Sequence, residues 1–231
     1  MIRAALIGNP NVGKTEIFNR LTGLSQRVGN FPGVTVEKKA GRLLHNGVEM
    51  EIIDLPGTYS FSCRAKDETA ARDYIVNEKP DVVVDIVDGT NLERNLYLTL
   101  LLQEMDVNLV LAVNRWDMAK AREIDIDLDK LSLLLGCPVV STVAVSGEGL
   151  PELLDAVAAA FDQNDHDCKI IAQSECNQDL ASDLQYDQQS LLAQMRYEKI
   201  AKIVEAIVKR GAEPASTFTD MLDLVFLNKY L

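Results

Sequence analysis

Residues 8–15 read G-N-P-N-V-G-K-T and match the pattern G-x-x-x-x-G-K-[ST] in full. The apolar run over residues 2–7 predicts a buried strand before this segment, and residues 15–21 predict the first turns of a helix after it. A glycine-rich turn between strand and helix points backbone N–H groups at phosphate oxygens, at the positive end of the helix dipole. The pattern therefore predicts a nucleotide site, with Lys14 reaching the β- and γ-phosphates and the Thr15 hydroxyl binding Mg²⁺. The residues expected to line this loop are Gly8, Asn9, Pro10, Asn11, Val12, Gly13, Lys14, Thr15 and Glu16.

Length and composition favour a globular chain with a sizeable core. Its 231 residues suffice for one large domain or for one domain with an appendage, and 47% of them are hydrophobic. The net charge of −12 argues against a nucleic-acid partner, because such binding depends on Lys and Arg neutralising phosphates. The sequence contains no signal peptide and no apolar run of about 18 residues. We therefore expect a soluble, intracellular polypeptide with reduced cysteines.

The first two thirds of the chain alternate between strand-like and helix-like patterns. Asn46-Gly47 lies between two strand-like runs and predicts a hairpin, because a type I′ turn needs positive φ at both residues. Later apolar runs are continuous, as in parallel strands covered on both faces. The sequence therefore predicts an α/β fold with a mixed, mostly parallel six-stranded sheet and helices on both faces. The expected strands are residues 2–7, 34–44, 48–53, 82–87, 109–113 and 138–142, and the helices beyond the first are residues 68–77, 92–104, 128–135 and 150–161.

The pattern changes near residue 162, which predicts a second unit. Residues 162–183 are polar and acidic, as in a linker. Beyond them apolar residues recur at helical spacing from Ile200 onward, and no strand pattern is present. We therefore expect a nucleotide-binding domain over residues 1–163 and, over residues 164–231, a linker and a small all-α domain. Its expected helices are residues 188–195, 197–210 and 217–229.

A second motif, Asp54-Leu55-Pro56-Gly57, ends the second hairpin strand and matches the D-x-x-G element of GTPases. Its position one strand after the first loop makes it more specific than the pattern alone. We expect Asp54 to hold Mg²⁺ through water and the N–H of Gly57 to sense the γ-phosphate.

A third motif, Asn114-Arg115-Trp116-Asp117, follows the strand over residues 109–113 and is similar to the base-recognition motif N-K-x-D. The Asp117 carboxylate would accept hydrogen bonds from guanine N1–H and the exocyclic amine, which adenine does not present. A buried acceptor that the wrong base leaves unpaired costs free energy, so this motif predicts preference for guanine. Arg115 replaces the usual Lys, and its alkyl stem can also pack beside the base.

A fourth segment, Ala144-Val145-Ser146, lies where a further guanine-binding element S-A-[KG] is expected after the strand over residues 138–142. Ala144 occupies the position of the serine. The N–H of Val145 remains able to meet guanine O6. This departure predicts weak binding with fast release.

Thr35, just before the first hairpin strand, is the candidate threonine that completes Mg²⁺ coordination when the γ-phosphate is present. A plain β-branched strand residue is the alternative interpretation of this position.

These elements in this order resemble the translation-factor-type small GTPases and, more closely, the cytosolic G domain of the FeoB family of bacterial ferrous-iron transporters. The segments over residues 28–37 and 91–98 are the most specific to that family, and the resemblance covers the whole chain. It implies a Ras-like P-loop GTPase fold followed by a helical, GDI-like regulatory domain. It also implies a membrane-spanning region after Leu231, so that this part lies at the cytoplasmic face of the bacterial inner membrane. The segments that carry the resemblance are residues 8–15, 28–37, 54–60 and 91–98.

The resemblance also implies how hydrolysis proceeds. Ras-like enzymes carry a water-orienting Gln directly after D-x-x-G, but Thr58 stands there in this chain. In FeoB-like GTPases a P-loop Asn, here Asn11, and switch I carbonyls bind K⁺ against the phosphates, which stabilises charge as an arginine finger does. The implied cofactor-binding residues of switch I are Gly33, Val34 and Thr35, and the implied catalytic set is Asn11, Lys14, Thr35 and Gly57. Asp67-Glu68 would belong to switch II, although a solvated helix N-terminus explains these two equally well.

The sequence thus predicts a slow, K⁺-activated GTPase that uses GTP/GDP, Mg²⁺ and K⁺ and regulates ferrous-iron transport. It is compatible with a homo-oligomer. Three alternatives remain open: a non-transport GTPase of the tRNA-modification or ribosome-assembly type, a nucleotide sensor with negligible hydrolysis, and an ATPase or mixed-nucleotide enzyme.

Overall fold

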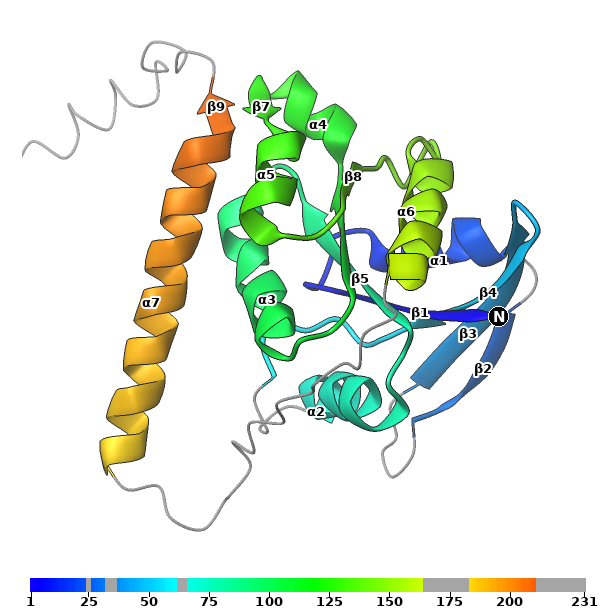
Figure 1. Ribbon diagram of the computed structural model, residues 1–231, viewed down its shortest axis with the longest axis horizontal. Helices are drawn as coiled ribbons and strands as arrows, with labels where there is room; N and C mark the ends of the chain where they lie inside the picture. The colour runs from blue at the N-terminus through cyan, green and yellow to red at the C-terminus, as the bar shows by residue number, and fades with distance from the viewer. Residues whose placement is uncertain (24–25, 32–36, 62–65, 164–182, 211–231) are drawn as a thin grey trace, which may run out of the picture.

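The centre of the molecule is a seven-stranded sheet in the order β2-β3-β4-β1-β5-β6-β8 (Figure 1). The computed structural model describes residues 1–23, 26–31, 37–61, 66–163 and 183–210. Strands β4, β1, β5, β6 and β8 run parallel to one another, whereas the pairs β2–β3 and β3–β4 are antiparallel. The mixed, mostly parallel α/β fold expected from the sequence is confirmed.

The elements have the following bounds. The strands are β1 (Ile2–Gly8), β2 (Gln26–Asn30), β3 (Glu37–His45), β4 (Val48–Asp54), β5 (Val82–Asp88), β6 (Leu109–Asn114), β7 (Ile124–Ile126), β8 (Val139–Ser141) and β9 (Val208–Arg210). The helices are α1 (Lys14–Thr22), α2 (Lys66–Asp73) with its π-helical continuation η1 (Tyr74–Glu78), α3 (Leu92–Glu104), α4 (Trp116–Ala121), α5 (Leu128–Leu135), α6 (Leu150–Gln163) and α7 (Asp183–Ile207).

Different helices cover the two faces of the sheet, which explains the continuous apolar strand sequences. Adjacent residues of β5 point to opposite faces of the sheet. Val84 lies in the hydrophobic cluster that contains Phe18 of α1, and Val83 lies in the cluster that contains Leu96 of α3. Figure 1 shows α1 and α6 on one side of the sheet and α3 and α5 on the other. The chain therefore forms three layers around the parallel strands.

The sheet has one strand more than the six expected. Strand β2 pairs antiparallel with β3, from Gln26 opposite Gly41 to Asn30 opposite Glu37. It is an edge strand, and its side chains are half-buried or exposed. Because it buries no face, its sequence shows no apolar run, and periodicity could not identify it.

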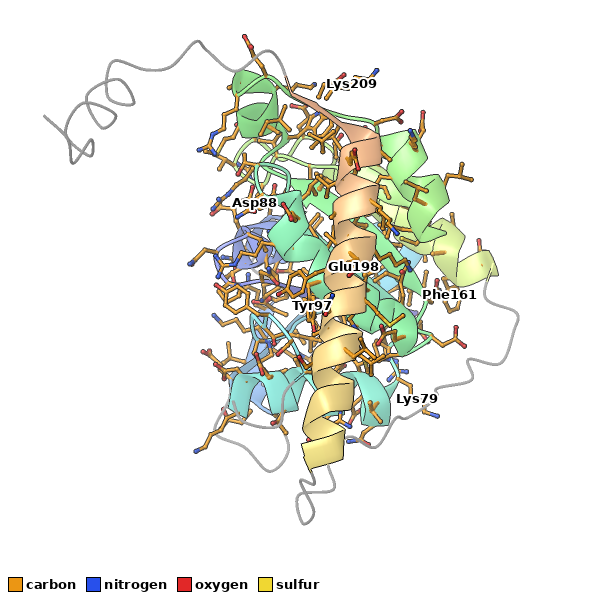
Figure 2. The ribbon with its side chains drawn as sticks, turned by 90° about the vertical axis from the view of Figure 1, so that its left-hand side faces the viewer. Lys79, Asp88, Tyr97, Phe161, Glu198 and Lys209 are labelled. Carbon is orange, nitrogen blue, oxygen red and sulfur yellow. The ribbon has the colours of Figure 1, made fainter. Side chains whose placement is uncertain are left out.

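The C-terminal described part differs from the expected pair of helices. Residues 183–207 form one helix, α7, which runs alongside α3 (Figure 2). The rings of Tyr97 on α3 and Tyr197 on α7 stack with centroids 5.0 Å apart. The Arg196 guanidinium also donates to both carboxylate oxygens of Glu104, at 2.8 and 2.6 Å. Helix α7 therefore packs directly on the α/β layer.

The expectation of no strand beyond residue 164 is wrong. Strand β9 pairs antiparallel with the short β7, from Ile124 opposite Arg210 to Ile126 opposite Val208. The N–H of Asp127 also donates to the carbonyl of Ile207 at 3.0 Å. Both strands have three residues, so neither carries a detectable alternation. The helix expected over residues 217–229 lies outside the described residues, and so does most of the expected linker.

Helix α4 and strand β7 were also not predicted, whereas the ranges expected for α3 and α5 agree with the structure. The division at residue 163 stays a prediction. Among the residues that the structure describes, no helix has both the length and the apolar character needed to span a bilayer.

Asp85 is a carboxylic acid buried completely in β5, on the face covered by α3. Thr99 of α3 donates from Oγ1 to Asp85 Oδ2 at 2.6 Å, while Oδ1 is buried without a hydrogen-bond partner. Burial raises the pKa of Asp85 from 3.8 to about 7, and the Thr99 bond offsets only part of that rise. The carboxyl is therefore more readily ionised in the unfolded chain than in the folded one.

This difference predicts a pH dependence of stability. Below pH 3.8 both states hold the proton; as pH rises to about 7 only the unfolded chain ionises at this site, so the free energy of unfolding falls. The free energy of unfolding changes by roughly 1.4 kcal/mol for each unit by which the folded and unfolded pKa values of Asp85 differ. In Asp85→Asn, which cannot ionise, we expect a flatter profile in urea unfolding between pH 4 and 8. Parallel profiles for the two proteins would contradict this account.

Candidate nucleotide-binding site

The predicted motifs meet at the carboxyl ends of the parallel strands. The loop at residues 9–13 follows β1, the D-x-x-G segment follows β4, and the N-x-x-D segment follows β6. Since β4, β1, β5, β6 and β8 are neighbours in the sheet, the loops after them lie along one edge. Ligands of open α/β sheets bind at this edge.

The phosphate-binding loop depends on two backbone positions with positive φ. Gly13, which precedes α1, has φ 92°, and a Cβ there would lie 2.4 Å from Nδ2 of Asn114. Asn11 has φ 68°, in the left-handed region that Asn tolerates better than most residues. The side chain of Asn11 is exposed. The loop conformation therefore requires glycine at position 13 and leaves the Asn11 amide facing outward from the core.

Lys14, Thr15 and Asp54 come together beneath this loop. The Lys14 ammonium forms a buried ion pair with Asp54 Oδ1, and Thr15 Oγ1 donates to Asp54 Oδ2 at 3.3 Å. A buried ammonium and carboxylate attract each other strongly because little water screens their charges. A hydroxyl and a carboxylate at this separation are hard oxygen donors of the kind that Mg²⁺ prefers, with phosphates completing its shell. These residues fit a Mg²⁺–phosphate site.

The D-x-x-G segment lies against the phosphate-binding loop. A Cβ on Gly57 would be 3.4 Å from the Cα of Pro10, and the Thr58 N–H donates to the Gly8 carbonyl at 3.1 Å. The Thr58 side chain is buried, and its hydroxyl donates to the carbonyl of Ser60. Thr58 is therefore turned into its own loop, away from the position where a side chain could orient water.

Asn114 joins three loops through one buried side-chain amide. Nδ2 donates to the Val12 carbonyl at 2.7 Å, and Oδ1 accepts from the Ala144 N–H at 2.9 Å. The Thr142 hydroxyl also donates to Oδ1, at 3.4 Å. Only 1% of Asn114 is exposed. The first residue of the base-recognition motif therefore holds the phosphate-binding loop and the segment after β8 in a fixed relation.

Arg115 forms a second bridge, which the sequence did not predict. Its guanidinium donates to Asp88 Oδ2 and to the Asn11 carbonyl, both at 2.6 Å. Asp88 ends β5, and its Oδ1 accepts from the N–H and hydroxyl of Thr90, at 2.8 and 2.7 Å. Arg115 itself has φ 59°. Its charge thus fixes the backbone of Asn11, whereas the sequence had suggested only packing of its stem beside a base.

The third and fourth motifs present exposed groups next to these anchors. Asp117, in the first turn of α4, is exposed. Val145 and Ser146 are exposed, whereas Ala144 is buried and its N–H is already bonded to Asn114. Of the three candidates in this segment, Val145 and Ser146 are therefore the ones with accessible backbone.

The remaining candidate residues lie around the loop or outside the described part of the chain. Asn9 is buried, and its Nδ2 donates to the carbonyl of Arg94 at 3.4 Å. Glu16 is exposed at the start of α1, Leu55 is buried and Pro56 half-buried. The Ser60 hydroxyl lies 3.3 Å from both carboxylate oxygens of Glu68. Gly33, Val34 and Thr35 lie outside the described residues.

Sequence reasoning missed two residues, Asp88 and Arg20. An acidic residue at the carboxyl end of a buried strand was a signal available for Asp88. Arg20, in the last turn of α1, donates to the carbonyls of Val145 and Ser146, and no sequence pattern marks it. Among the described residues, no three His, Cys, Asp or Glu side chains gather as a metal site.

The family model described as "Ferrous iron transport protein B" matches residues 2–157. Among known proteins, the chain is 51% identical over 158 residues to the Fe(2+) transport protein A/Fe(2+) transporter FeoB fusion protein of Porphyromonas gingivalis, covering 68% of this chain and 19% of that protein. It is 36% identical over 277 residues to the Fe(2+) transporter FeoB of Legionella pneumophila, covering 100% of this chain and 37% of that protein. The chain thus spans well under half the length of these relatives.

A similar solved structure is the cytosolic domain of the T. maritima FeoB iron transporter. Its GDP form II has a TM-score of 0.83 and 32% sequence identity, covering 90% of this chain and 100% of that one. Its GMPPNP form has a TM-score of 0.82 with the same identity and coverage.

The network around Asn114 makes a stability prediction. Asn114→Ala would leave the Val12 carbonyl and the Ala144 N–H buried without partners, at about 1–3 kcal/mol for each unpaired group. We expect the free energy of unfolding to fall by about 2–4 kcal/mol in urea titrations without nucleotide. Asn77→Ala, at an exposed asparagine in η1, is the control and should change it by less than about 0.5 kcal/mol. Equal effects of the two substitutions would count against the network.

Proposed function

The chain belongs to the FeoB family of ferrous iron transport proteins, and from this premise we propose that it binds GTP with Mg²⁺ and hydrolyses it slowly to GDP and phosphate. We further propose that K⁺ activates hydrolysis and that the chain regulates transport of Fe²⁺ by the longer protein of which it is the cytosolic part. The observation that carries the proposal is the convergence of Lys14, Thr15 and Asp54 under the loop that starts α1.

Phosphate binding would proceed by exchange of charged partners. The Lys14 ammonium is paired with the Asp54 carboxylate, which carries a negative charge as the β- and γ-phosphate oxygens do. On binding it would turn to the phosphates, and Asp54 would be left to hold water on the metal ion together with the Thr15 hydroxyl. Mg²⁺ supplies neutralisation of charge on the β- and γ-oxygens. The N–H of Gly57 would report the γ-phosphate, and Thr35 would complete the metal shell.

Base recognition rests on Asp117 and the segment after β8. An exposed carboxylate on Asp117 accepts from guanine N1–H and the 2-amine, and the N–H of Val145 donates to O6. Asn114 supports this arrangement through one N–H of Nδ2 to the Val12 carbonyl and through Oδ1 from the Ala144 N–H, and the second N–H of Nδ2 is left for the nucleotide. The GDP and GMPPNP forms of the T. maritima relative support a guanine nucleotide as the ligand.

The hydrolysis step needs charge stabilisation that the D-x-x-G segment does not offer. Water attacks the γ-phosphorus, and the bond from that phosphorus to the β–γ bridging oxygen breaks, with GDP leaving. Thr58 is buried and bonded to Ser60, so it contributes no side chain to this step. Asn11 is exposed on the loop that would hold the phosphates, and with switch I carbonyls it is the proposed K⁺ ligand. K⁺ would supply a positive charge beside the transferring group.

The transporter role extends beyond this chain. Because its relatives are longer, we propose a membrane-spanning region after Leu231 and a position at the cytoplasmic face of the bacterial inner membrane. Nucleotide state, read by residues 28–37 and 54–60, would pass to the helical part, which contacts α3 through α7. A nucleotide sensor with negligible hydrolysis is the second candidate, and the inward-turned Thr58 is the observation that favours it.

Base specificity tests the first part of the proposal. The chain should bind GTP at least tenfold more tightly than ATP in isothermal titration with Mg²⁺, because only guanine satisfies the Asp117 carboxylate. Asp117→Ala should remove most of that preference, while Asp125→Ala, an exposed carboxylate on β7, should keep it. Equal affinity of the unaltered chain for both nucleotides would reject the Asp117 assignment.

Replacing Na⁺ by K⁺ tests the second part. Phosphate release from GTP should rise severalfold or more in K⁺, and Asn11→Ala should abolish that increase while GDP binding persists. Asn77→Ala, an exposed asparagine remote in sequence from the loop, is the matched control. Hydrolysis that is measurable but indifferent to K⁺ would reject the cation mechanism, and no hydrolysis in either salt would favour the sensor.

A further inference from the structure

The loop after β8 is closed at its base, and at its tip the Ser146 hydroxyl donates to the Val143 carbonyl at 3.4 Å and accepts from the Glu148 N–H at 3.3 Å. Val143 and Glu148 pair across the base, and the N–H of Gly147 donates to the Val143 carbonyl at 2.8 Å. At the tip, 73% of Val145 is exposed and Ser146 is exposed as well. The tip therefore has no apolar packing of its own to fix the direction of its peptide groups.

Arg20 supplies a further anchor, from another element. It lies in the last turn of α1, and its guanidinium donates from Nη1 to the Ser146 carbonyl at 3.2 Å and from Nη2 to the Val145 carbonyl. Hydrogen bonds from a charged donor are stronger than neutral ones, and the planar fork of Arg holds two acceptors in fixed geometry. A Cβ at Gly147 would come within 3.2 Å of Nη1, so the guanidinium lies directly against the turn.

These contacts set where the tip amides point. In a trans peptide the N–H and C=O are antiparallel, so a Val145 carbonyl turned to α1 directs the Ser146 N–H away from α1. Neither the Val145 nor the Ser146 N–H donates to an acceptor among the described residues. The Ala144 N–H, by contrast, is committed to Asn114. Arg20 thus orders a short segment whose Val145 and Ser146 N–H groups are available to a ligand.

We propose that Arg20 is a positioning residue for the guanine base, which it holds through the Val145–Ser146 peptide groups without contacting the nucleotide. This rests on the proposed function, in which the Val145 N–H meets guanine O6. That N–H belongs to the peptide between the Ala144 N–H, which Asn114 holds, and the Val145 carbonyl, which Arg20 holds, so it is fixed from both sides. Arg20 offsets the absence of the usual serine at Ala144, because it holds the tip carbonyls from outside the loop and so adds to the two hydrogen bonds of the Ser146 hydroxyl within it. Its effect is to slow nucleotide release.

Helix α1 gives this contact a second consequence. Lys14 and Arg20 stand six residues apart on the same nine-residue helix, about 9 Å along its axis. The phosphate site is at one end of that helix. At the other end is the clamp, which is the pair of hydrogen bonds from Arg20 to the Val145 and Ser146 carbonyls. A single rigid element therefore ties the two halves of the nucleotide site together.

The test is the dissociation rate of a fluorescent N-methylanthraniloyl-GDP, chased with excess GDP. We expect about tenfold faster release from Arg20→Ala, an intermediate rate from Arg20→Lys, which has one ammonium for two carbonyls, and an unchanged rate from Arg122→Ala. Arg122 is an exposed arginine on the C-terminal side of α4, so it controls for loss of positive charge.

Two further measurements separate positioning from a merely structural role. Unfolding of Arg20→Ala without nucleotide should occur within about 0.5 kcal/mol of the unaltered chain, as for other exposed side chains. Its single-turnover hydrolysis, measured with the protein in large excess over GTP so that released nucleotide rebinds, should have an unchanged rate because the phosphate groups are held elsewhere. Equal release rates for the unaltered chain and Arg20→Ala would overturn the clamp alone. Failure of the unaltered chain to bind GDP would overturn the proposed function and the clamp with it.

Discussion

The buried amide of Asn114 is the interaction on which the rest of the site depends. It lies at the end of β6, and its hydrogen bonds reach Val12 in the phosphate-binding loop and Ala144 after β8. Those two loops are formed by segments more than a hundred residues apart in the chain. A side chain with one donor group and one acceptor, shielded from water, holds them at a fixed separation because breaking either bond leaves a buried polar group unpaired. The same amide limits residue 13 to glycine.

Two ion pairs also hold the phosphate-binding loop in place. Arg115 binds Asp88 and the Asn11 carbonyl, and Lys14 binds Asp54, so the loop is held from two sides by ion pairs. The two pairs differ in burial: Lys14 and Asp54 are nearly inaccessible, whereas 38% of the Arg115 side chain is exposed. The Lys14 pair is therefore the one whose rearrangement would have the larger electrostatic effect. A chain with a net charge of −12 can attract a nucleotide because these cations act locally.

The sequence predicted most of the layered fold, because buried parallel strands such as β5 are continuous apolar runs and helices such as α3 have apolar residues at helical spacing. It did not predict β2, because an exposed edge strand buries no face, nor β7 and β9, because each has only three residues and exists through pairing with the other. The motifs located Lys14, Asp54 and Asn114. They did not indicate Arg20 or the bridge from Arg115 to Asp88, because those contacts join residues that only the folded chain brings together.

A crystal structure of this chain with a non-hydrolysable GTP analogue, Mg²⁺ and K⁺ would test the central claim most directly. The account predicts that the Lys14 ammonium leaves Asp54 for the β- and γ-phosphates, that Thr15 Oγ1 binds the metal ion, and that Asn114 keeps its bonds to Val12 and Ala144. A nucleotide bound elsewhere, with the Lys14–Asp54 pair intact, would contradict it.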